Sequence, residues 1–307
     1  SKISVRFAPS PTGFLHVGGL RTALYNYLFA KQNKGVFFLR IEDTDQSRYV
    51  PGAVEALLKT IETAGFELDE GPVLKNGEIT EKGKYGPYFQ SKRLDIYKKY
   101  ADELTAKDHA YYCFCSADRL DQLRKTQEIN KQPTMYDGLC RNLTPAEVKK
   151  KLTTGERHVI RMNIPKEGQT IFQDLIHGEV KFENKLIDDQ VLVKSDGFPT
   201  YHLAHAVDDH LMETSHVIRG DEWLSSTPKH LQLFKAFDWS APAYAHIPLL
   251  LNPDRSKLSK RQGDVAVEDY LKKGYLAEAL INFIALLGWN PGTEKEIFSL
   301  DELIKGF

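Results

Sequence analysis

The sequence near the amino terminus contains two short, mostly apolar runs with a helical repeat between them. The runs cover residues 5–8 and 36–41, and each predicts a buried strand. The pattern as a whole predicts a strand–helix–strand unit of a parallel α/β sheet, in which ligands bind beyond the carboxyl ends of the strands. The helical repeat between the runs has a period near 3.6 residues and consists of Leu20, Leu24, Tyr27 and Leu28.

The middle of the chain has a different pattern. Helical periodicity at about 52–64 and 91–107 is separated by a loop over 70–88 that is rich in glycine and lysine. Residues 110–190 then carry all the cysteines, a charged helix near 118–130 and short strand-like runs such as 158–162. We interpret 110–190 as an inserted α+β domain, after which the main fold is expected to resume at 191–193 and 216–219.

The carboxyl-terminal part is predicted to be helical. Thr227-Pro228 places a proline in the first turn of one helix. A later apolar stripe, which Gly288 ends, consists of Leu276, Leu280, Phe283, Ile284 and Leu287. The predicted fold class is therefore α/β. Its parts are a Rossmann-type parallel sheet at 1–109 and 191–250, the insert at 110–190, and a basic loop with a helical segment at 251–307.

Composition excludes several classes of protein. Of the 307 residues, 41% are hydrophobic, which suits a packed core, and no run reaches the roughly 18 apolar residues of a membrane span. The 41 basic and 42 acidic residues nearly cancel, so any contact with nucleic acid must come from local basic patches. Three cysteines make no disulfide framework and favour a reducing compartment. Composition alone therefore predicts a soluble intracellular protein.

Two motifs point to a nucleotide. Residues 9–19, Pro-Ser-Pro-Thr-Gly-Phe-Leu-His-Val-Gly-Gly, lie between the first predicted strand and helix, where backbone N–H groups and the helix dipole can face phosphate. Gly18 and Gly19 lack Cβ atoms and would let a ribose or purine approach the main chain. Residues 257–261, Lys-Leu-Ser-Lys-Arg, offer mobile charges for a polyphosphate. Taken singly, the histidine reads as an ordinary loop residue and the basic run as a solvated turn.

Together the two motifs resemble the signatures of class I aminoacyl-tRNA synthetases. The resemblance to glutamyl-tRNA synthetases is closer still, because it extends in order over residues 6–13, 40–45, 199–204, 207–212 and 217–224. The glutaminyl relatives usually carry Pro-Glu-Pro-Asn where this chain has Pro-Ser-Pro-Thr. The chain thus resembles the catalytic amino-terminal part of a glutamyl-tRNA synthetase, and we expect it to be truncated before the family's helical anticodon-binding region.

The resemblance implies a two-step reaction. L-Glutamate and ATP, which brings Mg²⁺, would form glutamyl-adenylate, and the 3′-terminal ribose of tRNA(Glu) would then take the glutamyl group. Chemistry of this kind needs positioning and charge neutralisation more than a covalent protein nucleophile. The catalytic candidates are His16, Lys257 and Lys260. The ATP-binding candidates are His16, Gly18, Gly19, Glu222, Leu250, Lys257, Leu258, Ser259, Lys260 and Arg261.

The amino-acid pocket follows from the charges of glutamate. Its two carboxylates call for guanidinium groups, and its ammonium calls for a carboxylate. Arg6 and Arg219 each end a predicted strand, so both should point into one crevice. Glu42, which ends another strand, could take the ammonium. The full set of substrate candidates, which the resemblance supports, is Arg6, Ala8, Ser10, Glu42, Tyr201, His205 and Arg219.

Three points about this pocket stay open at this level. Tyr201 could donate its phenol to a carboxylate, with Ser10 assisting Glu42 at the ammonium. His205 stands where the family often has asparagine, and a histidine is bulkier and titratable. Arg6 and Glu42 could instead form only a buried ion pair, and Arg219 could pair at the surface with Asp221 or Glu222.

The cysteines raise a separate question. One arrangement in the family is C-x-C…Y-x₃-C, which Cys113, Cys115, Tyr136 and Cys140 match, and four such ligands would hold a structural Zn²⁺. The alternative is a set of thiols without metal. The metal would stabilise the insert, which in the family receives the acceptor end of tRNA. The lysines at 149–151 could contact that stem or could simply be a solvated helix face.

Two rival functions remain at this stage. A shorter paralogue glutamylates a modified base in a tRNA anticodon and shares the cysteine pattern, although residues 208–212 and the helical tail favour the full synthetase. A non-catalytic tRNA-binding module is the other rival. We expect a monomer without membrane association, in the bacterial cytoplasm or the mitochondrial matrix.

Overall fold

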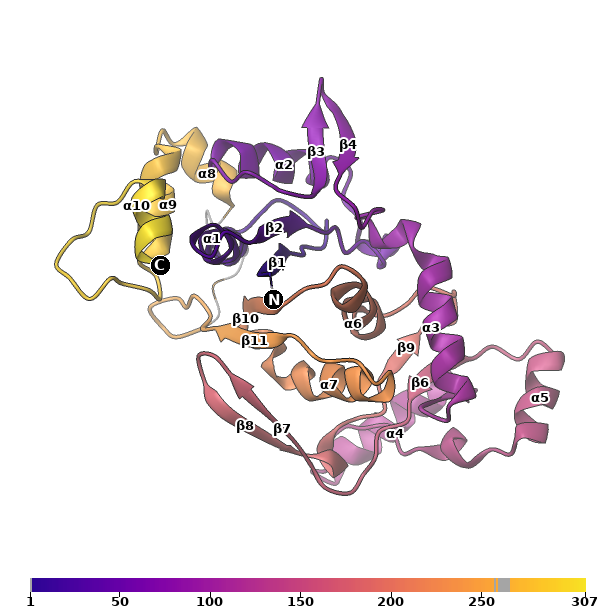
Figure 1. Cartoon of the computed structure of the whole chain (residues 1–307). Helices are drawn as coiled ribbons and strands as arrows, with labels where there is room; N and C mark the ends of the chain where they lie inside the picture. Colours follow the sequence, from indigo (N-terminus) through magenta and orange to yellow (C-terminus); the bar gives the residue numbers. More distant parts are fainter. Residues whose placement is uncertain (1, 257, 259–265) are drawn as a thin grey trace.

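The computed structural model describes residues 2–256, 258 and 266–307, and it contains the predicted first unit (Figure 1). Strand β1 (Ser4–Phe7), helix α1 (Val17–Gln32) and strand β2 (Val36–Leu39) follow one another in the chain. The two strands pair in parallel, with Ser4 opposite Val36 and Phe7 opposite Leu39. Helix α1 covers them and buries the apolar repeat that predicted it.

A second parallel pair lies beside the first. Strand β10 (His216–Gly220) leads through the 3₁₀ helix η5 (Asp221–Ser226) and helix α7 (Thr227–Ala236) to strand β11 (Ala243–Ile247). β1 lies next to β10, and the Ser215 N–H donates to the Ser4 carbonyl at 2.8 Å. Among the described residues, the two pairs nevertheless form separate ladders, so the pairing does not resolve one continuous sheet. Both pairs contribute to the same hydrophobic core.

The predicted loop over 70–88 is instead partly a hairpin. Helix α2 (Ala53–Thr63) is followed by strands β3 (Gly71–Lys75) and β4 (Glu78–Lys82), which pair antiparallel, and then by η2 (Gln90–Lys92) and α3 (Leu94–Ala106). The turn is Asn76-Gly77, with φ of 54° and 82°. Positive φ at both positions is the geometry of a tight two-residue hairpin, and Asn-Gly is its strongest sequence signal. The charged composition of β4, which contains Glu78, Glu81 and Lys82, concealed it.

The insert contains a three-stranded antiparallel sheet in the order β5 (Ala110–Cys113), β6 (Val159–Met162), β9 (Val191–Val193). Strand β9, which we expected in the resumed main sheet, therefore pairs with the insert instead. The helical parts of this region are α4 (Ala117–Ile129), η3 (Leu139–Asn142), α5 (Pro145–Thr153) and η4 (Asn184–Leu186). The exact limits of the insert stay a prediction.

A second hairpin joins the insert to the β10–β11 pair. Strands β7 (Gln169–Asp174) and β8 (Gly178–Glu183) pair antiparallel, and β7 continues the β10–β11 ladder, where Asp174 lies opposite Tyr244. Helix α6 (Tyr201–Leu211) and helix α7 share a second core with α3 and the strands of the insert. The hairpin therefore places insert residues directly beside β11.

The carboxyl-terminal segment contains helices α8 (Val267–Lys272), α9 (Ala277–Ala285) and α10 (Leu300–Gly306), of which α9 and α10 pack on α1 (Figure 1). The predicted apolar stripe is only partly buried: Leu280 and Ile284 lie in the core, whereas Leu276 and Phe283 are about three-fifths exposed. The Tyr25 hydroxyl anchors the end of α9 by donating to the Ala285 carbonyl at 2.9 Å. Across the described residues, no helix combines the length and apolar character needed to cross a bilayer.

Candidate active site

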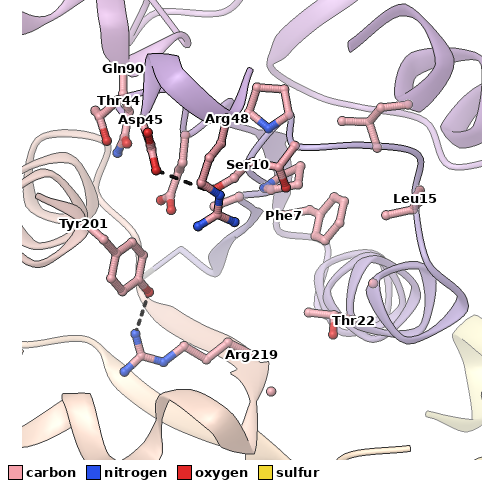
Figure 2. Close-up of a pocket in the computed structure, with 18 of the residues that line it drawn as sticks. Phe7, Ser10, Leu15, Thr22, Thr44, Asp45, Arg48, Gln90, Tyr201 and Arg219 are labelled. Atoms are coloured by element: carbon pink, nitrogen blue, oxygen red, sulfur yellow. Dashed lines mark hydrogen bonds and ion pairs between the residues drawn. The ribbon is translucent and has the colours of Figure 1, made fainter. Parts of the chain in front are cut away.

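A cavity of about 680 Å³ opens at the carboxyl ends of β1, β2 and β10, as parallel α/β topology predicts (Figure 2). Figure 2 shows Tyr201 and Arg219 together on one side of it, with Ser10, Arg48 and Asp45 across from them. The sequence candidates that line this cavity are Arg6, Ala8, Ser10, His16, Gly19, Glu42, Tyr201, Arg219 and Glu222. The structure thus brings together residues 6–57 and residues 194–223, which are far apart in the sequence.

A smaller cavity of about 270 Å³ adjoins the first and shares His16, Gly19 and Glu222 with it. Its other sequence candidates are Gly18, Leu250 and Leu258. The Leu258 N–H donates to the Leu250 carbonyl at 3.1 Å, which holds this part of the basic motif at the edge of the cavity. The remaining members of that motif, Lys257, Ser259, Lys260 and Arg261, lie outside the described residues.

His16 caps the helix that points at both cavities. Its backbone is extended, and its Nδ1 accepts a hydrogen bond from the Gly18 N–H at 2.9 Å. Because Nδ1 is the acceptor, a neutral ring carries its proton on Nε2. The Leu15 side chain packs closely here, since a Cβ on Gly19 would lie 2.8 Å from Leu15 Cδ1. The loop is therefore folded tightly against the start of α1.

Glu222 lies just after β10, where the chain turns sharply. A Cβ on Gly220 would come within 2.0 Å of Glu222 Oε2, so only glycine allows the carboxylate to lie over the strand end. This position puts Glu222 in the wall shared by the two cavities. A carboxylate there can accept from hydroxyl groups of a ribose.

Arg219 is a buried cation surrounded by uncharged groups. Its guanidinium donates to Tyr201 Oη and Thr227 Oγ1 at 2.9 Å each, and to His246 Nε2 at 3.1 Å. No ion pair among the described residues includes Arg219, and Asp221 pairs with His177 instead. The surface pair considered from the sequence is therefore absent from the described ion pairs. A buried guanidinium in such surroundings gains from an anionic ligand.

Tyr201 is oriented by this contact. Since its phenol oxygen accepts from Arg219, its own proton is available to a group in the cavity. Burial raises the pKa of Tyr201, so the phenol stays protonated at neutral pH. Arg219 and Tyr201 together form a pair of donors suited to one carboxylate.

Arg6 and Glu42 do not pair with each other. Arg6 makes a bidentate contact with Asp209, at 2.9 Å from Nε and 3.2 Å from Nη2. Arg40 bridges the two acids, with Nη1 2.8 Å from Asp209 Oδ1 and Nη2 3.0 Å from Glu42 Oε1. The alternative in which Arg6 and Glu42 pair only with each other is therefore wrong, and both residues belong to a buried chain of Arg6, Asp209, Arg40 and Glu42.

Charge compensation differs between the two acids of this chain. Burial by itself would raise the pKa of Asp209, but the Arg6 and Arg40 guanidinium groups hold it at about 2. Burial raises the pKa of Glu42 above its ordinary value, against the opposing effect of Arg40 and Arg6. Asp209 is thus firmly ionised, whereas Glu42 gains from a further cation. The sequence showed Asp209 within a family-like run and gave no sign of its partners.

His205 lies behind the cavity and not in its wall. The ring is fully buried, with Nδ1 3.2 Å from Asp209 Oδ2 and Nε2 3.5 Å from Arg219 Nη1. Burial, Arg219 and Arg6 lower the pKa of His205 well below its ordinary value, so the ring is neutral at pH 7. Any effect of His205 on a ligand in this arrangement passes through the two arginines.

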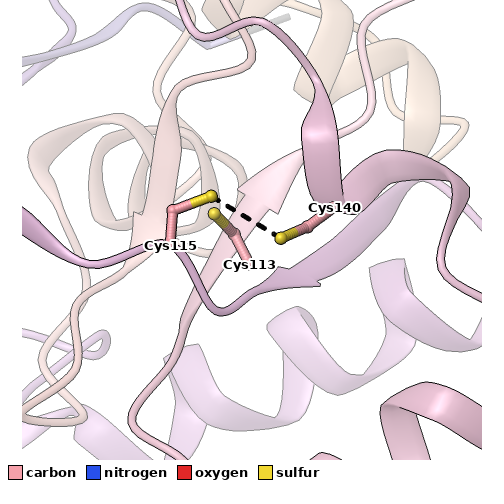
Figure 3. Close-up of side chains that lie close together, drawn as sticks. All are labelled: Cys113, Cys115 and Cys140. Carbon is pink, nitrogen blue, oxygen red and sulfur yellow. Dashed lines mark hydrogen bonds between the residues drawn. The ribbon is translucent and has the colours of Figure 1, made fainter. Parts of the chain in front are cut away.

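The three cysteines of the insert lie close together (Figure 3), and Tyr136 contacts two of them. The three sulfur atoms lie within 4.8 Å of one another, and Cys115 Sγ is 3.7 Å from Cys140 Sγ. The phenol oxygen of Tyr136 lies 3.4 Å from Cys113 Sγ and 3.3 Å from Cys115 Sγ. Two sulfurs on a tetrahedral zinc, each about 2.3 Å from the metal, would be about 3.8 Å apart. The donor set therefore fits zinc in both chemistry and spacing.

The chain belongs to the class I tRNA synthetases of the E and Q group, whose catalytic domain matches residues 2–307. It is 54% identical over 305 residues to a glutamate–tRNA ligase of Alkaliphilus metalliredigens, and 53% identical over 306 residues to one of Clostridioides difficile. Each alignment covers 99% of this chain and 62% of the relative. The chain thus spans about three-fifths of the length of these relatives.

Solved structures agree with this assignment. A crystal structure of a glutamate tRNA ligase from Elizabethkingia meningosepticum, in complex with its amino acid, superimposes with a TM-score of 0.90 at 45% identity. It matches all of this chain and 65% of its own length. A glutamate-tRNA synthetase from Elizabethkingia anophelis gives a TM-score of 0.91 at 45% identity. The resemblance seen in the sequence motifs is confirmed at the level of the family and of the mixed α/β catalytic fold.

Proposed function

We propose that this chain is the catalytic part of a glutamate–tRNA ligase, which makes glutamyl-adenylate from L-glutamate and ATP and passes the glutamyl group to the 3′-terminal ribose of tRNA(Glu). One observation carries the proposal: Arg6, Glu42, Tyr201 and Arg219 line a single cavity that adjoins the loop of His16. Relatives at about 54% identity that are glutamate–tRNA ligases support it.

Glutamate fits the cavity by charge. Arg219 and Tyr201 would take one carboxylate, since their donors face the same space and Arg219 has uncharged partners. Glu42 would take the ammonium, which would offset the burial that raises its pKa. Ala8 and Ser10 follow β1 in the cavity wall and would contact the backbone atoms of the amino acid. His205 would keep the two arginines apart.

ATP would occupy the smaller cavity and the space it shares with the larger one. In the first step a glutamate carboxylate oxygen attacks the α-phosphorus, and the bond to the bridging oxygen of pyrophosphate breaks. The Nε2–H of His16 and the dipole of α1 would stabilise charge that develops on the phosphate oxygens. Mg²⁺ would neutralise the polyphosphate when it arrives with ATP. In the second step the ribose hydroxyl attacks the acyl carbon and AMP leaves.

The strand arrangement supports this placement of glutamate and ATP in the two cavities. We infer that β2, β1, β10 and β11 form the Rossmann-type half of the catalytic domain, with β1 and β10 as its central strands, because Ser4 and Ser215 join them by hydrogen bonds. Ligands in such folds bind outside the carboxyl ends of the strands. Bacterial relatives also support a place in the bacterial cytoplasm.

Lys260→Ala is expected to lower the rate of glutamate activation about a hundredfold, because a charge that stabilises the departing pyrophosphate is lost. The measurement is ATP–pyrophosphate exchange with glutamate and tRNA(Glu) present. The KM for glutamate should change little, since the amino acid lies at the other cavity. An unchanged rate would remove Lys260 from the proposed machinery.

The acceptor site on tRNA distinguishes the proposal from its rivals. Radiolabelled glutamate is supplied with ATP and tRNA, and the labelled nucleoside is then identified. Label on the terminal adenosine ribose supports the ligase. Label on a modified anticodon base supports the base-glutamylating paralogue instead, and tRNA binding without any exchange activity supports a non-catalytic module.

We also propose that Cys113, Cys115, Cys140 and Tyr136 hold one structural Zn²⁺. Cys140→Ser is expected to abolish stoichiometric zinc, as measured by elemental analysis of the purified chain, and to lower the thermal midpoint of unfolding. Tyr136→Phe is the matched variant, because it keeps the ring and removes only the oxygen. If the Tyr136→Phe variant retains zinc, the phenol is not the fourth ligand and another group must supply it. A wild-type chain that contains no zinc after growth in zinc-supplemented medium would contradict the site.

A further inference from the structure

A carboxylate from the β7–β8 hairpin reaches the back of the glutamate pocket. Asp174, the last residue of β7, lies 2.6 Å through Oδ2 from His246 Nδ1, and both side chains are fully buried. The other ring nitrogen of His246, Nε2, lies 3.1 Å from Arg219 Nε. Three residues from three strands therefore form a line that ends at the guanidinium facing the cavity.

The hydrogen-bond roles along this line are determined by the chemistry of its members. Arg219 Nε can only donate, so His246 Nε2 must accept. A neutral imidazole with Nε2 as acceptor carries its proton on Nδ1, which then donates to Asp174. Burial and the neighbouring Arg219 lower the pKa of His246, which keeps the ring neutral and limits it to one proton. The imidazole can therefore accept the hydrogen bond from Arg219 only in this one tautomer.

Asp174 is itself held in place by its turn. Its Oδ1 accepts the backbone N–H groups of Ile176 and His177 at 2.9 and 3.0 Å, which leaves Oδ2 directed at His246. The pKa of Asp174 is lowered despite its burial, because His246 and these N–H groups stabilise the carboxylate. The side chain of His177 adds a contact with Asp221 at 2.7 Å. The turn after β7 thus contacts the loop of Glu222 as well as the line to Arg219.

We propose that Asp174 is a positioning residue for amino-acid binding: it fixes the tautomer of His246, whose Nε2 then orients the Arg219 guanidinium toward the cavity. The inference rests on the proposed function, because the ligand of Arg219 is taken to be glutamate. It makes the pocket depend on a residue that the sequence places in the insert, outside the strands that form the cavity. Asp174 itself lines neither of the two cavities among the described residues.

The decisive variant is Asp174→Asn. The turn N–H groups would keep the amide oxygen at the position of Oδ1, so the amide nitrogen would face His246 Nδ1. The ring would then have to move its proton to Nε2, where it would oppose the Arg219 Nε–H. The Arg219 Nε–H would then be a buried donor without an acceptor, and the guanidinium would no longer be held toward the cavity. The expected loss of glutamate affinity is about tenfold or greater. The fold itself keeps its volume and packing.

The experiment measures glutamate binding to this chain by calorimetry and the His246 tautomer by ¹⁵N NMR of histidine-labelled protein. Asp174→Asn is expected to raise the glutamate Kd at least about tenfold and to move the His246 proton to Nε2. In exchange assays of the full protein, KM for glutamate should rise while KM for ATP stays unchanged. Glu179→Gln is the matched control, because it removes a charge from the same hairpin at an exposed pair with Lys181.

A second pair of variants covers the case in which Asp174→Asn folds poorly. His246→Gln retains an oxygen that can accept from Arg219, whereas His246→Leu does not, so glutamine should preserve glutamate affinity better than leucine. Equal losses in these two, or an Asp174→Asn chain with an unchanged Kd and the proton still on Nδ1, would overturn the inference. A wild-type chain that binds no glutamate would instead refute the proposed function, and the NMR result on the ligand-free chain would still decide the tautomer.

Discussion

Asp209→Ala is expected to lower the free energy of unfolding by about 3–5 kcal/mol, because it leaves two buried guanidinium groups without their shared counter-ion. Arg6 and Arg40 contact Asp209 at 2.9 and 2.8 Å, and all three side chains are at most 4% exposed. Urea unfolding followed by circular dichroism measures the loss. An unchanged urea midpoint would mean that the contacts of Asp209 with Arg6 and Arg40 contribute nothing to the stability of the fold.

Glu213→Gln is the matched control for this variant. It removes an acid only four residues along the chain, but Glu213 pairs with Lys84 at the surface, where both side chains are about two-thirds exposed. A pair of that kind contributes about 1 kcal/mol or less. A comparable loss in both variants would show that net charge, and not the buried chain of arginines and acids, causes the effect.

The same interaction makes a prediction about acid stability. The folded-state pKa of Asp209 is about 2, below its ordinary value of 3.8, so the folded state holds its proton more weakly than the unfolded state. Its contribution is therefore complete above about pH 4 and is lost as the pH falls toward 2. Asp209→Asn should lose this part of the acid dependence, which unfolding measured from pH 6 to pH 2 would show.

Arg219→Met is expected to reduce glutamate affinity by about 10²–10³-fold, because the cavity loses the cation that would pair with a carboxylate. Stability should change far less than in Asp209→Ala. The partners of Arg219 in the described structure are uncharged, so its removal leaves no buried carboxylate without a counter-ion. Calorimetric titration with glutamate, together with urea unfolding of the same samples, measures both effects.

Arg124→Met serves as the control, since Arg124 lies on α4 with an exposed pair to Asp121. It makes the same chemical change outside the cavity and should leave the glutamate Kd unaltered. Retained glutamate binding in Arg219→Met would contradict the proposed pocket. Under the proposed function, the two buried arginines of the cavity would separate by role: the pair of Arg6 with Asp209 would support the fold, and Arg219 would bind the ligand.

The sequence anticipated the local elements well where one signal dominated. The apolar repeat from Leu20 to Leu28 predicted α1, because a helix that buries one face in the core repeats its apolar residues about every 3.6 positions. The short apolar runs predicted β1 and β2, which are buried in the same core. It failed for the β3–β4 hairpin, whose second strand is mostly charged and exposed, so that only the Asn76-Gly77 turn marked it. It also assigned β9 to the wrong sheet, because three apolar residues say nothing about which strand they pair with.

The sequence by itself determined the family, the order of its motifs and a set of site candidates, nearly all of whose described members line the cavities, because each motif is a short run whose chemistry is legible without a fold. Only the tertiary structure decided which charges meet. Arg6 and Asp209 are 203 positions apart, and Asp174 and His246 are 72 apart. Pairing over such separations depends on how strands align and helices pack. Only the three-dimensional structure could therefore show the counter-ion of Arg6, the uncharged surroundings of Arg219 and the line from Asp174 through His246.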